Sequence, residues 1–309
     1  SNNTAVGYAA LTANTTGAGN SALGKGSLGA NTTGENNVAV GANALDANTT
    51  AANNTAVGYS SLGANTTGER NTAVGSLAGD ALTDADDNVA IGQTALGLDT
   101  LGSKSVAVGR AALATQNFTS ATDSYNTAVG FQAGEAVTTG TNNTLIGGLA
   151  GDAITTGASN TAVGYNSLSA NTTGLANVAL GQNALSTNTT ASDNTALGAH
   201  ALDVNTTGAS NTGVGRNALR ANTTGASNTA VGYASLVANT TGTQNVAIGS
   251  QASLANTTGQ DNISIGLLAG RGNTTANYSV AIGTLALGST SNNGGSNVGI
   301  GYYALSVNT

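Results

Sequence analysis

The chain has 309 residues, of which 45 are Gly, and it carries a formal net charge of −7 at pH 7. Only 7% of the residues are charged, and Pro and Cys are absent, so the composition differs from that of charge-rich, Pro-rich disordered chains and excludes disulfides and thiolate metal sites. The seven basic residues are scattered and form no stripe that could replace counterions, so neither nucleic acid nor an anionic membrane is an expected partner. The sequence contains no run of about 18 apolar residues, so it predicts no membrane-inserted segment.

An aliphatic residue followed by Gly recurs along the whole chain. The glycines of these pairs are residues 7, 24, 41, 58, 75, 92, 109, 130, 147, 164, 181, 198, 215, 232, 249, 266, 283 and 301. Their spacing is 17 residues, except for 21 between Gly109 and Gly130 and 18 before Gly301. Self-similarity at a fixed period is the signature of a repeat architecture. The sequence therefore predicts a single continuous repeat domain over residues 1–309, built from 18 coils of about 17 residues.

Each coil begins with the pattern N-[T/V]-A-[V/I/L]-G, in which residues alternate with the period of a strand. We expect the second and fourth positions, such as Val38 and Val40, to form a buried ladder, because the fourth is aliphatic in all 18 coils. A following A-L pair, containing for example Leu28 or Leu45, is expected to supply the opposing wall. The segment N-T-T-G then turns the chain. Strands this short, joined by Gly-containing turns, predict an all-β parallel β-solenoid with one coil per repeat.

In three coils the Leu of the A-L pair is replaced by Gly, and an aliphatic residue appears three positions later. These pairs are Gly79 with Leu82, Gly134 with Val137, and Gly151 with Ile154. We expect the later residue to refill the core at the next corner. Gly270 is followed by Asn273 instead, and there we expect Leu267 and Leu268 to compensate.

The longer spacing between Gly109 and Gly130 adds four residues to one coil. These predict a small outward loop near residues 116–125 that leaves the stack of coils unbroken.

Two further coil positions hold small residues. The third strand position is Ala in 14 coils, and the residue before the Leu, such as Ala10 or Ser27, is Ala or Ser in all of them. If these small residues face outward, as the alternation suggests, they favour another backbone packed closely against the strands. A coil with about three apolar side chains also encloses a thin core. Both observations predict a homo-oligomer.

The units N-T-A-V-G and N-V-A-I-G resemble repeats of the heads of YadA-type trimeric autotransporter adhesins. The complete unit at residues 54–70, NTAVGYSSLGANTTGER, resembles repeats of phage tail fibres and bacterial surface proteins, which often precede an endosialidase-type chaperone domain. The resemblance covers all the coils. It implies a left-handed β-roll, three chains about one axis, and a place outside the cell or on a virion. The coil is longer than the adhesin-head repeat, so binding to collagen-type matrix is not carried over.

The residues offer little for catalysis. His200 is the only histidine, and we interpret it as a solvent-facing side chain. Asp84, Asp86 and Asp87 lie close together, but no aromatic platform for a sugar accompanies them; a weak Ca²⁺ site at this corner stays an alternative. The N-T-T triplets match the N-glycosylation pattern, although we interpret their Asn as a structural ladder. We therefore predict no catalytic, cofactor-binding or metal-binding residues and no enzymatic activity.

The position directly after the aliphatic-Gly pair varies and often holds Tyr or Arg, which are enriched at binding hot spots. This contact stripe comprises Tyr8, Tyr59, Arg110, Phe131, Tyr165, Arg216, Tyr233 and Tyr302, with Lys25 at the same position. The alternative interpretation is that these residues are simply exposed corners or that they support a seam between chains.

These observations favour a structural, fibre-forming shaft of an extracellular appendage with an adhesive or host-attachment role, either a phage tail fibre or a bacterial surface filament. Its expected partners are copies of itself, most simply in a trimer, and cell-surface glycans or proteins. Neither end carries a polar cap, so we expect either further coils or an end-to-end polymer.

An ice-binding solenoid is the alternative function, and a polysaccharide-cleaving tailspike is a weaker one because paired acids and an aromatic platform are missing.

Overall fold

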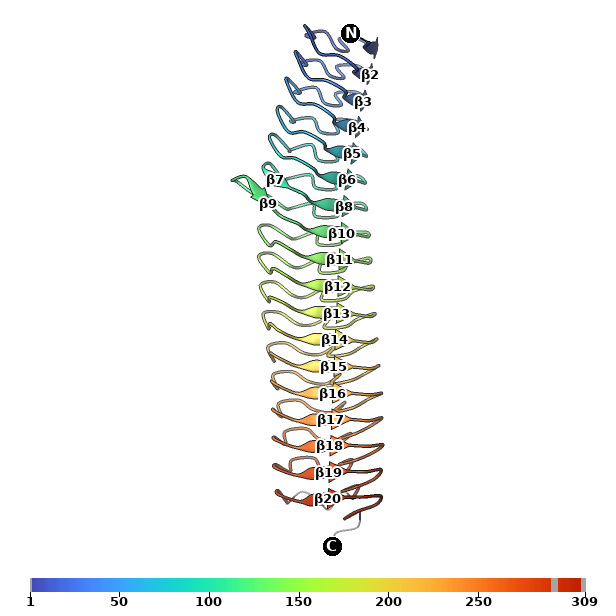
Figure 1. The fold of residues 1–309 in the computed structure, drawn as a ribbon, viewed down its shortest axis with the longest axis vertical. Coiled ribbons are helices and arrows are strands. Elements are labelled where there is room, and N and C mark those ends of the chain that lie inside the picture. Colours follow the sequence, from blue (N-terminus) through green and yellow to red (C-terminus); the bar gives the residue numbers. More distant parts are fainter. Residues whose placement is uncertain (1, 290–293, 307–309) are drawn as a thin grey trace. The chain divides into compact units, whose positions relative to one another are not determined.

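The computed structural model describes residues 2–289 and 294–306 of the chain. Within these ranges every regular element is a β-strand, and the strands stack as an all-β parallel solenoid of about 18 coils, as the repeat predicted (Figure 1). The chain divides into two compact units, Ser1–Ala158 and Ser159–Thr309, which are described separately.

Nine strands of the first unit form one parallel ladder. They are β1 (Thr4–Val6), β2 (Ser21–Leu23), β3 (Val38–Val40), β4 (Thr55–Val57), β5 (Thr72–Val74), β6 (Val89–Ile91), β8 (Val106–Val108), β10 (Thr127–Val129) and β11 (Thr144–Ile146). Equivalent coil positions lie opposite each other, so that Ala39 pairs with Ala56 and Val40 with Val57. The 17-residue period therefore sets the strand register directly.

The second unit repeats this arrangement. Its strands are β12 (Thr161–Val163), β13 (Val178–Leu180), β14 (Thr195–Leu197), β15 (Thr212–Val214), β16 (Thr229–Val231), β17 (Val246–Ile248), β18 (Ile263–Ile265), β19 (Val280–Ile282) and β20 (Val298–Ile300). All neighbouring strands within the unit pair in parallel and in register, from β12 with β13 to β19 with β20.

The four-residue insertion lies beside the ladder of the first unit. β8 and β10 pair directly, with Ala107 opposite Ala128, while the extra residues contribute β9 (Thr122–Asp123), which pairs with β7 (Gly102–Ser103). Figure 1 shows β7 and β9 on the side of the coil away from the main strands. The segment expected as a loop at residues 116–125 thus contains a short strand of its own, and the ladder is not interrupted.

A buried carboxylate holds the start of this insertion. Asp99 is fully buried and accepts hydrogen bonds from the backbone N–H of Gly102 at 3.1 Å and of Phe118 at 3.0 Å. The Nε2 of Gln116 donates to its second oxygen at 2.6 Å. Asp99 stands where other coils have the Asn of N-T-T, and its two acceptor oxygens suit three donors from the longer coil.

The strands face the opposite way from the sequence prediction. The central residue is buried in every three-residue strand except β1, and it is 0% exposed at Ala39 and Ala56. The flanking Val38 and Val40 face out and are exposed and half-buried, respectively. A strand of three residues turns just its middle side chain inward, because successive side chains alternate between faces. The interior is too narrow for two branched side chains from every strand. The prediction that the second and fourth coil positions form a buried ladder was therefore wrong.

The small residues before the Leu also point inward. Ser27 and Ala44 are fully buried, which corrects the prediction that this position lies on an outward face. The uniform small size at this position and at the strand centre reflects limited interior space rather than a neighbouring chain.

The wall of Leu residues was predicted correctly. Leu28, Leu45 and Leu62 are fully buried, and their φ angles of +50°, +51° and +49° lie in the left-handed region. This backbone conformation costs about 1–3 kcal/mol for a non-Gly residue, and burial of the side chain contributes a similar amount in return. The strand-ending glycine has another reason for its identity: at Gly41, where φ is +136°, an added Cβ would collide with the carbonyl of Gly58.

The refilling of the core by later residues is confirmed. Leu82, Val137 and Ile154 are all fully buried, and a Cβ added at Gly79 would lie 3.1 Å from Leu82 Cδ1. The prediction that Leu267 and Leu268 compensate for the missing Leu side chain at Gly270 was wrong. Leu267 is 48% exposed and Leu268 is half-buried outside the core, so neither residue fills the interior there.

Two ladders of buried Asn residues satisfy the backbone at the corners. In one, Asn54 Oδ1 accepts from the backbone N–H of Asn71 at 2.9 Å, and its Nδ2 donates to Gly68 O at 2.9 Å. In the other, Asn48 Nδ2 donates to Asn31 Oδ1 at 2.7 Å and to Ala51 O at 3.2 Å. Buried polar groups need such partners, which explains why Asn recurs at these coil positions.

Candidate contact surface

The fourth coil position forms an aliphatic ladder on the outer face of the strands. Many of its members are exposed, each in register with the next, and the residues between them are half-buried. Its exposed members are Val6, Leu23, Val74, Ile91, Val129 and Ile146 in the first unit, and Leu180, Leu197, Ile248, Ile265, Ile282 and Ile300 in the second. Neighbouring strands lie about 4.8 Å apart, so within each unit the ladder is a continuous apolar surface. Contiguous exposed apolar surface is typical of interaction sites, which makes the ladder a candidate contact surface.

Each residue of the contact stripe predicted from the sequence lies two positions after the ladder residue of the same coil. All eight of its residues are exposed, and the exposed fraction of its aromatic members ranges from 48% at Phe131 to 80% at Tyr8. Within the first unit the guanidinium of Arg110 lies 5.4 Å from the ring centre of Phe131, close enough for a cation–π contact. Leu267, at the same coil position, is a further exposed apolar member that the sequence analysis placed in the core.

The acidic corner of the first unit is neutralised by basic residues from neighbouring coils. Arg70 lies 2.8 Å from Glu69, 3.3 Å from Asp86 and 2.7 Å from Asp87. The hydrogen bond from Arg70 lowers the pKa of Asp87 below its ordinary value, with burial acting weakly against it.

Lys104 pairs in the same way with Asp123 at 2.5 Å, and this hydrogen bond lowers the pKa of the Asp123 carboxyl. Among the described residues no group of three or more His, Asp or Glu side chains could hold a metal ion. Asp86 and Asp87 are thus paired with Arg70 of the preceding coil, whereas Asp84 accepts a hydrogen bond from the Thr67 hydroxyl.

His200 is half-buried and hydrogen-bonded rather than simply solvent-facing. Its Nδ1 lies 2.9 Å from Asp203 Oδ2, and the Ser186 hydroxyl donates to Asp203 Oδ1 at 2.6 Å. The carboxylate stands between the hydroxyl and the imidazole. Activation of a serine needs the base next to the hydroxyl, so this arrangement is a surface network rather than a nucleophilic site.

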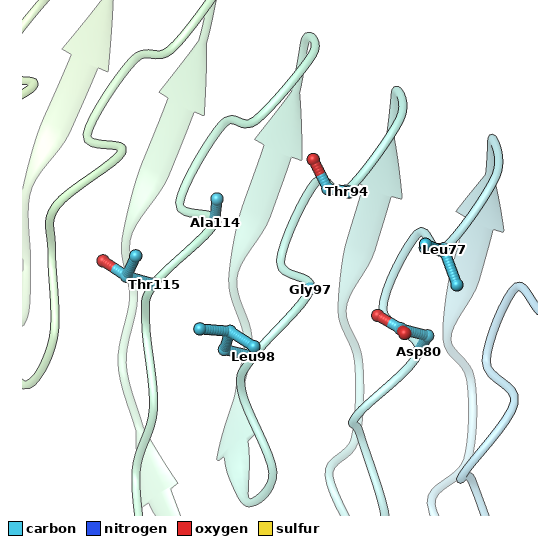
Figure 2. A pocket seen from close by; sticks show the side chains of 7 residues that line it. All are labelled: Leu77, Asp80, Thr94, Gly97, Leu98, Ala114 and Thr115. Carbon is cyan, nitrogen blue, oxygen red and sulfur yellow. The ribbon is translucent and has the colours of Figure 1, made fainter.

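A groove on the turn segments after β5, β6 and β8 was not foreseen from the sequence (Figure 2). It is lined by Leu77, Asp80, Thr94, Gly97, Leu98, Ala114 and Thr115. Burial raises the pKa of Asp80 above its ordinary value. One carboxylate among these seven residues does not provide the pair that glycoside hydrolysis requires.

The Asn of the N-T-T triplets is inaccessible in the folded chain. Asn31, Asn48 and Asn65 are fully buried, and the Nδ2 of each donates to an Asn of the preceding coil and to a carbonyl three residues later. This is the Asn ladder that the repeat predicted. A glycan on these amides would require the turn to unfold.

Comparisons with known proteins give no family for this chain: no family model, curated protein or solved structure matches it. In the part of the chain that the structure describes, no helix is long and apolar enough to cross a membrane.

Proposed function

We propose that the chain is the structural shaft of an extracellular fibre, that it associates with copies of itself through the aliphatic ladder, and that it has no enzymatic activity. The observation that carries this proposal is the ladder itself. A single chain leaves an in-register column of Val, Ile and Leu side chains in water on the outer face of each unit.

The energetics of one coil support association. The interior of a typical coil holds one strand Ala, one further Ala or Ser, and one Leu, which is a thin core for 17 ordered residues. Covering a partly exposed ladder side chain contributes on the order of 1 kcal/mol. Because every coil contributes such a residue, the gain grows with the number of coils, and a partner with the same repeat matches the ladder coil for coil.

The number of chains follows from the resemblance of N-T-A-V-G to the heads of trimeric adhesins, which favours a homotrimer on a phage tail fibre or a bacterial surface filament. Native mass spectrometry and sedimentation at micromolar concentration test the self-association. We expect the unsubstituted chain to be trimeric. A folded, monodisperse monomer would sink the proposal.

A triple variant places a charge in the ladder of the second unit, namely Leu197→Lys, Ile248→Lys and Ile265→Lys. Its matched control, Thr207→Lys, Thr224→Lys and Thr241→Lys, places the same charges on exposed turn residues. We expect the ladder variant to dissociate into chains that keep their β-sheet circular dichroism, and the control to remain associated. Equal dissociation of both variants would mean that added charge, rather than the ladder, is responsible.

The attachment role rests on the contact stripe, whose exposed Tyr side chains offer large rigid contact areas to cell-surface glycans or proteins. We expect Tyr59→Ala, Tyr165→Ala and Tyr233→Ala together to reduce binding of the fibre to cells while the oligomer is retained. Tyr278→Ala, at an exposed corner outside the stripe, serves as the control. Unchanged attachment of the triple variant would remove the stripe from the binding surface.

The Thr residues favour this proposal over ice binding. The first Thr of each triplet bonds to the next coil, as Thr32 Oγ1 does to Thr49 O at 3.0 Å, which leaves one exposed Thr per turn. Such a single row is a poor match for a two-dimensional lattice. We expect no thermal hysteresis in solutions of the purified chain.

A further inference from the structure

The groove of Figure 2 places one carboxylate beside apolar side chains. Leu77, Leu98 and Ala114 are its aliphatic members, and Asp80 is the one charged residue among those that line it. Leu98 is 56% exposed and Leu77 is half-buried. In Figure 2 the carboxyl of Asp80 points toward the coil that carries Gly97 and Leu98. The groove therefore combines a negative charge with an apolar wall.

Asp80 has no cation from its own chain. No ion pair of Asp80 occurs among the residues that the structure describes. Burial raises the pKa of its carboxyl, whereas the hydrogen bond from Arg70 lowers the pKa of Asp87. A partly buried carboxylate attracts a cation more strongly than a fully solvated one, because its surroundings screen the charge less.

An equivalent carboxylate in the second unit shows what surrounds this coil position elsewhere in the chain. Asp203, like Asp80, stands five residues after the strand-ending Gly. Its Oδ2 lies 2.9 Å from His200 Nδ1 and 3.9 Å from Arg220 Nε. His200 precedes Asp203 by three residues, and Arg220 follows it by 17 residues, in the next coil. The chain thus surrounds this carboxylate with basic side chains from two positions.

In the first unit the same two positions hold uncharged residues. Leu77 stands at the position of His200, and Gly97 stands at the position of Arg220. A Cβ added at Gly97 would lie 3.5 Å from Asp80 Oδ1, so a side chain at this position begins next to the carboxylate. Because Gly97 has none, the place of the cation is open to a group from outside. The groove has a volume of about 300 Å³, at the lower end of the range of about 300–1,000 Å³ for ligand pockets, which suits a single extended side chain.

We propose that this groove binds the side chain of an arginine from a partner protein. The guanidinium pairs with Asp80, and the aliphatic stem lies against Leu77 and Leu98. A guanidinium is a planar fork that matches a carboxylate and keeps its charge at physiological pH, and the methylene groups of a long basic side chain cover apolar surface. The net charge of −7 favours the approach of a basic partner. The groove shares no residue with the aliphatic ladder, so this binding goes beyond the shaft function.

Binding of n-propylguanidinium to the full chain tests the proposal, because this ion is the side chain of arginine without its backbone. Saturation-transfer NMR of the ion should give a dissociation constant on the order of millimolar. Its neutral isostere n-propylurea should bind roughly tenfold more weakly, because it cannot form a charge-assisted pair with Asp80. Equal binding of the urea would overturn the proposal, since the groove would then recognise apolar surface alone.

Two matched variants locate the bound ion. Asp80→Asn keeps the size of the side chain and should weaken binding of n-propylguanidinium roughly tenfold. The control is Asp46→Asn at the same coil position, where Asn43 and Ala64 stand in place of the two Leu residues of the groove, and it should leave the affinity unchanged. An equal loss in both variants would show that the ion follows negative charge in general and would contradict the groove.

A third variant supplies the missing cation from the chain itself. Gly97→Arg places an arginine beside Asp80, at the coil position that Arg220 holds beside Asp203. We expect this variant to keep its β-sheet circular dichroism and to lose binding of n-propylguanidinium, because its own guanidinium occupies the groove. A folded Gly97→Arg chain that binds the ion with the original affinity would place the ion elsewhere and overturn the proposal.

Discussion

The inward and outward faces of each strand differ in what limits their side chains. Inside, the strand residue is mostly Ala and is fully buried, as at Ala196, while one residue further on Leu197 is 41% exposed. The interior admits one small strand side chain opposite one Leu, whereas the outer face accepts any branched aliphatic residue. Residue size, more than hydrophobicity, therefore tells which face is the interior of a narrow solenoid.

Truncating one Leu on each face should give the largest contrast. Leu202→Ala removes a fully buried side chain and should lower the free energy of unfolding by about 2–5 kcal/mol. The outward Leu197→Ala should cost about 1 kcal/mol or less in the dissociated chain, because much of the side chain already contacts water. Urea denaturation of both variants, at concentrations where the chains are separate, measures the difference. Equal costs would mean that the two faces are not energetically distinct.

The inward face also depends on its Asn ladders. Asn54→Ala leaves the buried N–H of Asn71 without its acceptor, whereas the carbonyl of Gly68 keeps its hydrogen bond from Asn65 Nδ2. The variant should cost about 1–3 kcal/mol, the cost of one buried orphan. Thr50→Ala, on the exposed side of a turn, should change stability by less than about 0.5 kcal/mol. Hydrogen exchange of the N–H of Asn71 locates the effect, and continued protection there would contradict the assigned bond.

A smaller effect tests the size limit itself. Gly213 occupies the inward strand position of β15, and an added Cβ would lie 3.4 Å from Leu202 Cγ, so Gly213→Ala should be accommodated. Gly213→Val adds two more methyl groups to the same space and should cost about 1–3 kcal/mol by overpacking. Thermal unfolding of the two variants decides this. A stable Val variant would show that the interior is wider than the Ala column implies.

The repeat predicted the architecture because a fixed 17-residue spacing leaves one in-register stacking of the strands. Leu28 and Leu82 were placed correctly in the core, since each is the largest apolar residue of its segment. The strand faces were assigned wrongly because alternation gives two faces without saying which is inside. The uniform Ala at positions such as Ala39 was the available signal, and it was attributed to a neighbouring chain. The contact stripe needed no such choice, because a position that admits Tyr59, Arg110 and Gln93 must lie outside.

The groove and a buried hydrogen bond between Ser253 and Ser264 illustrate what a repeat consensus does not contain. The groove of Figure 2 forms where three turns happen to carry Leu77, Gly97 and Leu98. The buried bond from Ser253 Oγ to Ser264 Oγ depends on two substitutions that meet across neighbouring coils. Both arise from departures from the consensus, and their consequences appear only when the coils are stacked.

The smallest effect concerns two carboxylates outside the core. Burial raises the pKa of Asp80 in the folded chain above 3.8. The protonated carboxyl therefore stabilises the folded state at low pH, and this stabilisation is lost as pH rises through the folded-state pKa. The pKa of Asp87 is lowered from 3.8 by Arg70, so its contribution is present at neutral pH and lost as pH falls. We expect Asp80→Asn to stabilise and Asp87→Asn to destabilise the chain at pH 7, each by less than about 1 kcal/mol because both groups are partly solvated. Both differences should vanish once each carboxyl is protonated in the folded and unfolded states. Urea unfolding from pH 7 down to about pH 3 follows this, and effects of the same sign at pH 7 would contradict the opposite environments of the two groups.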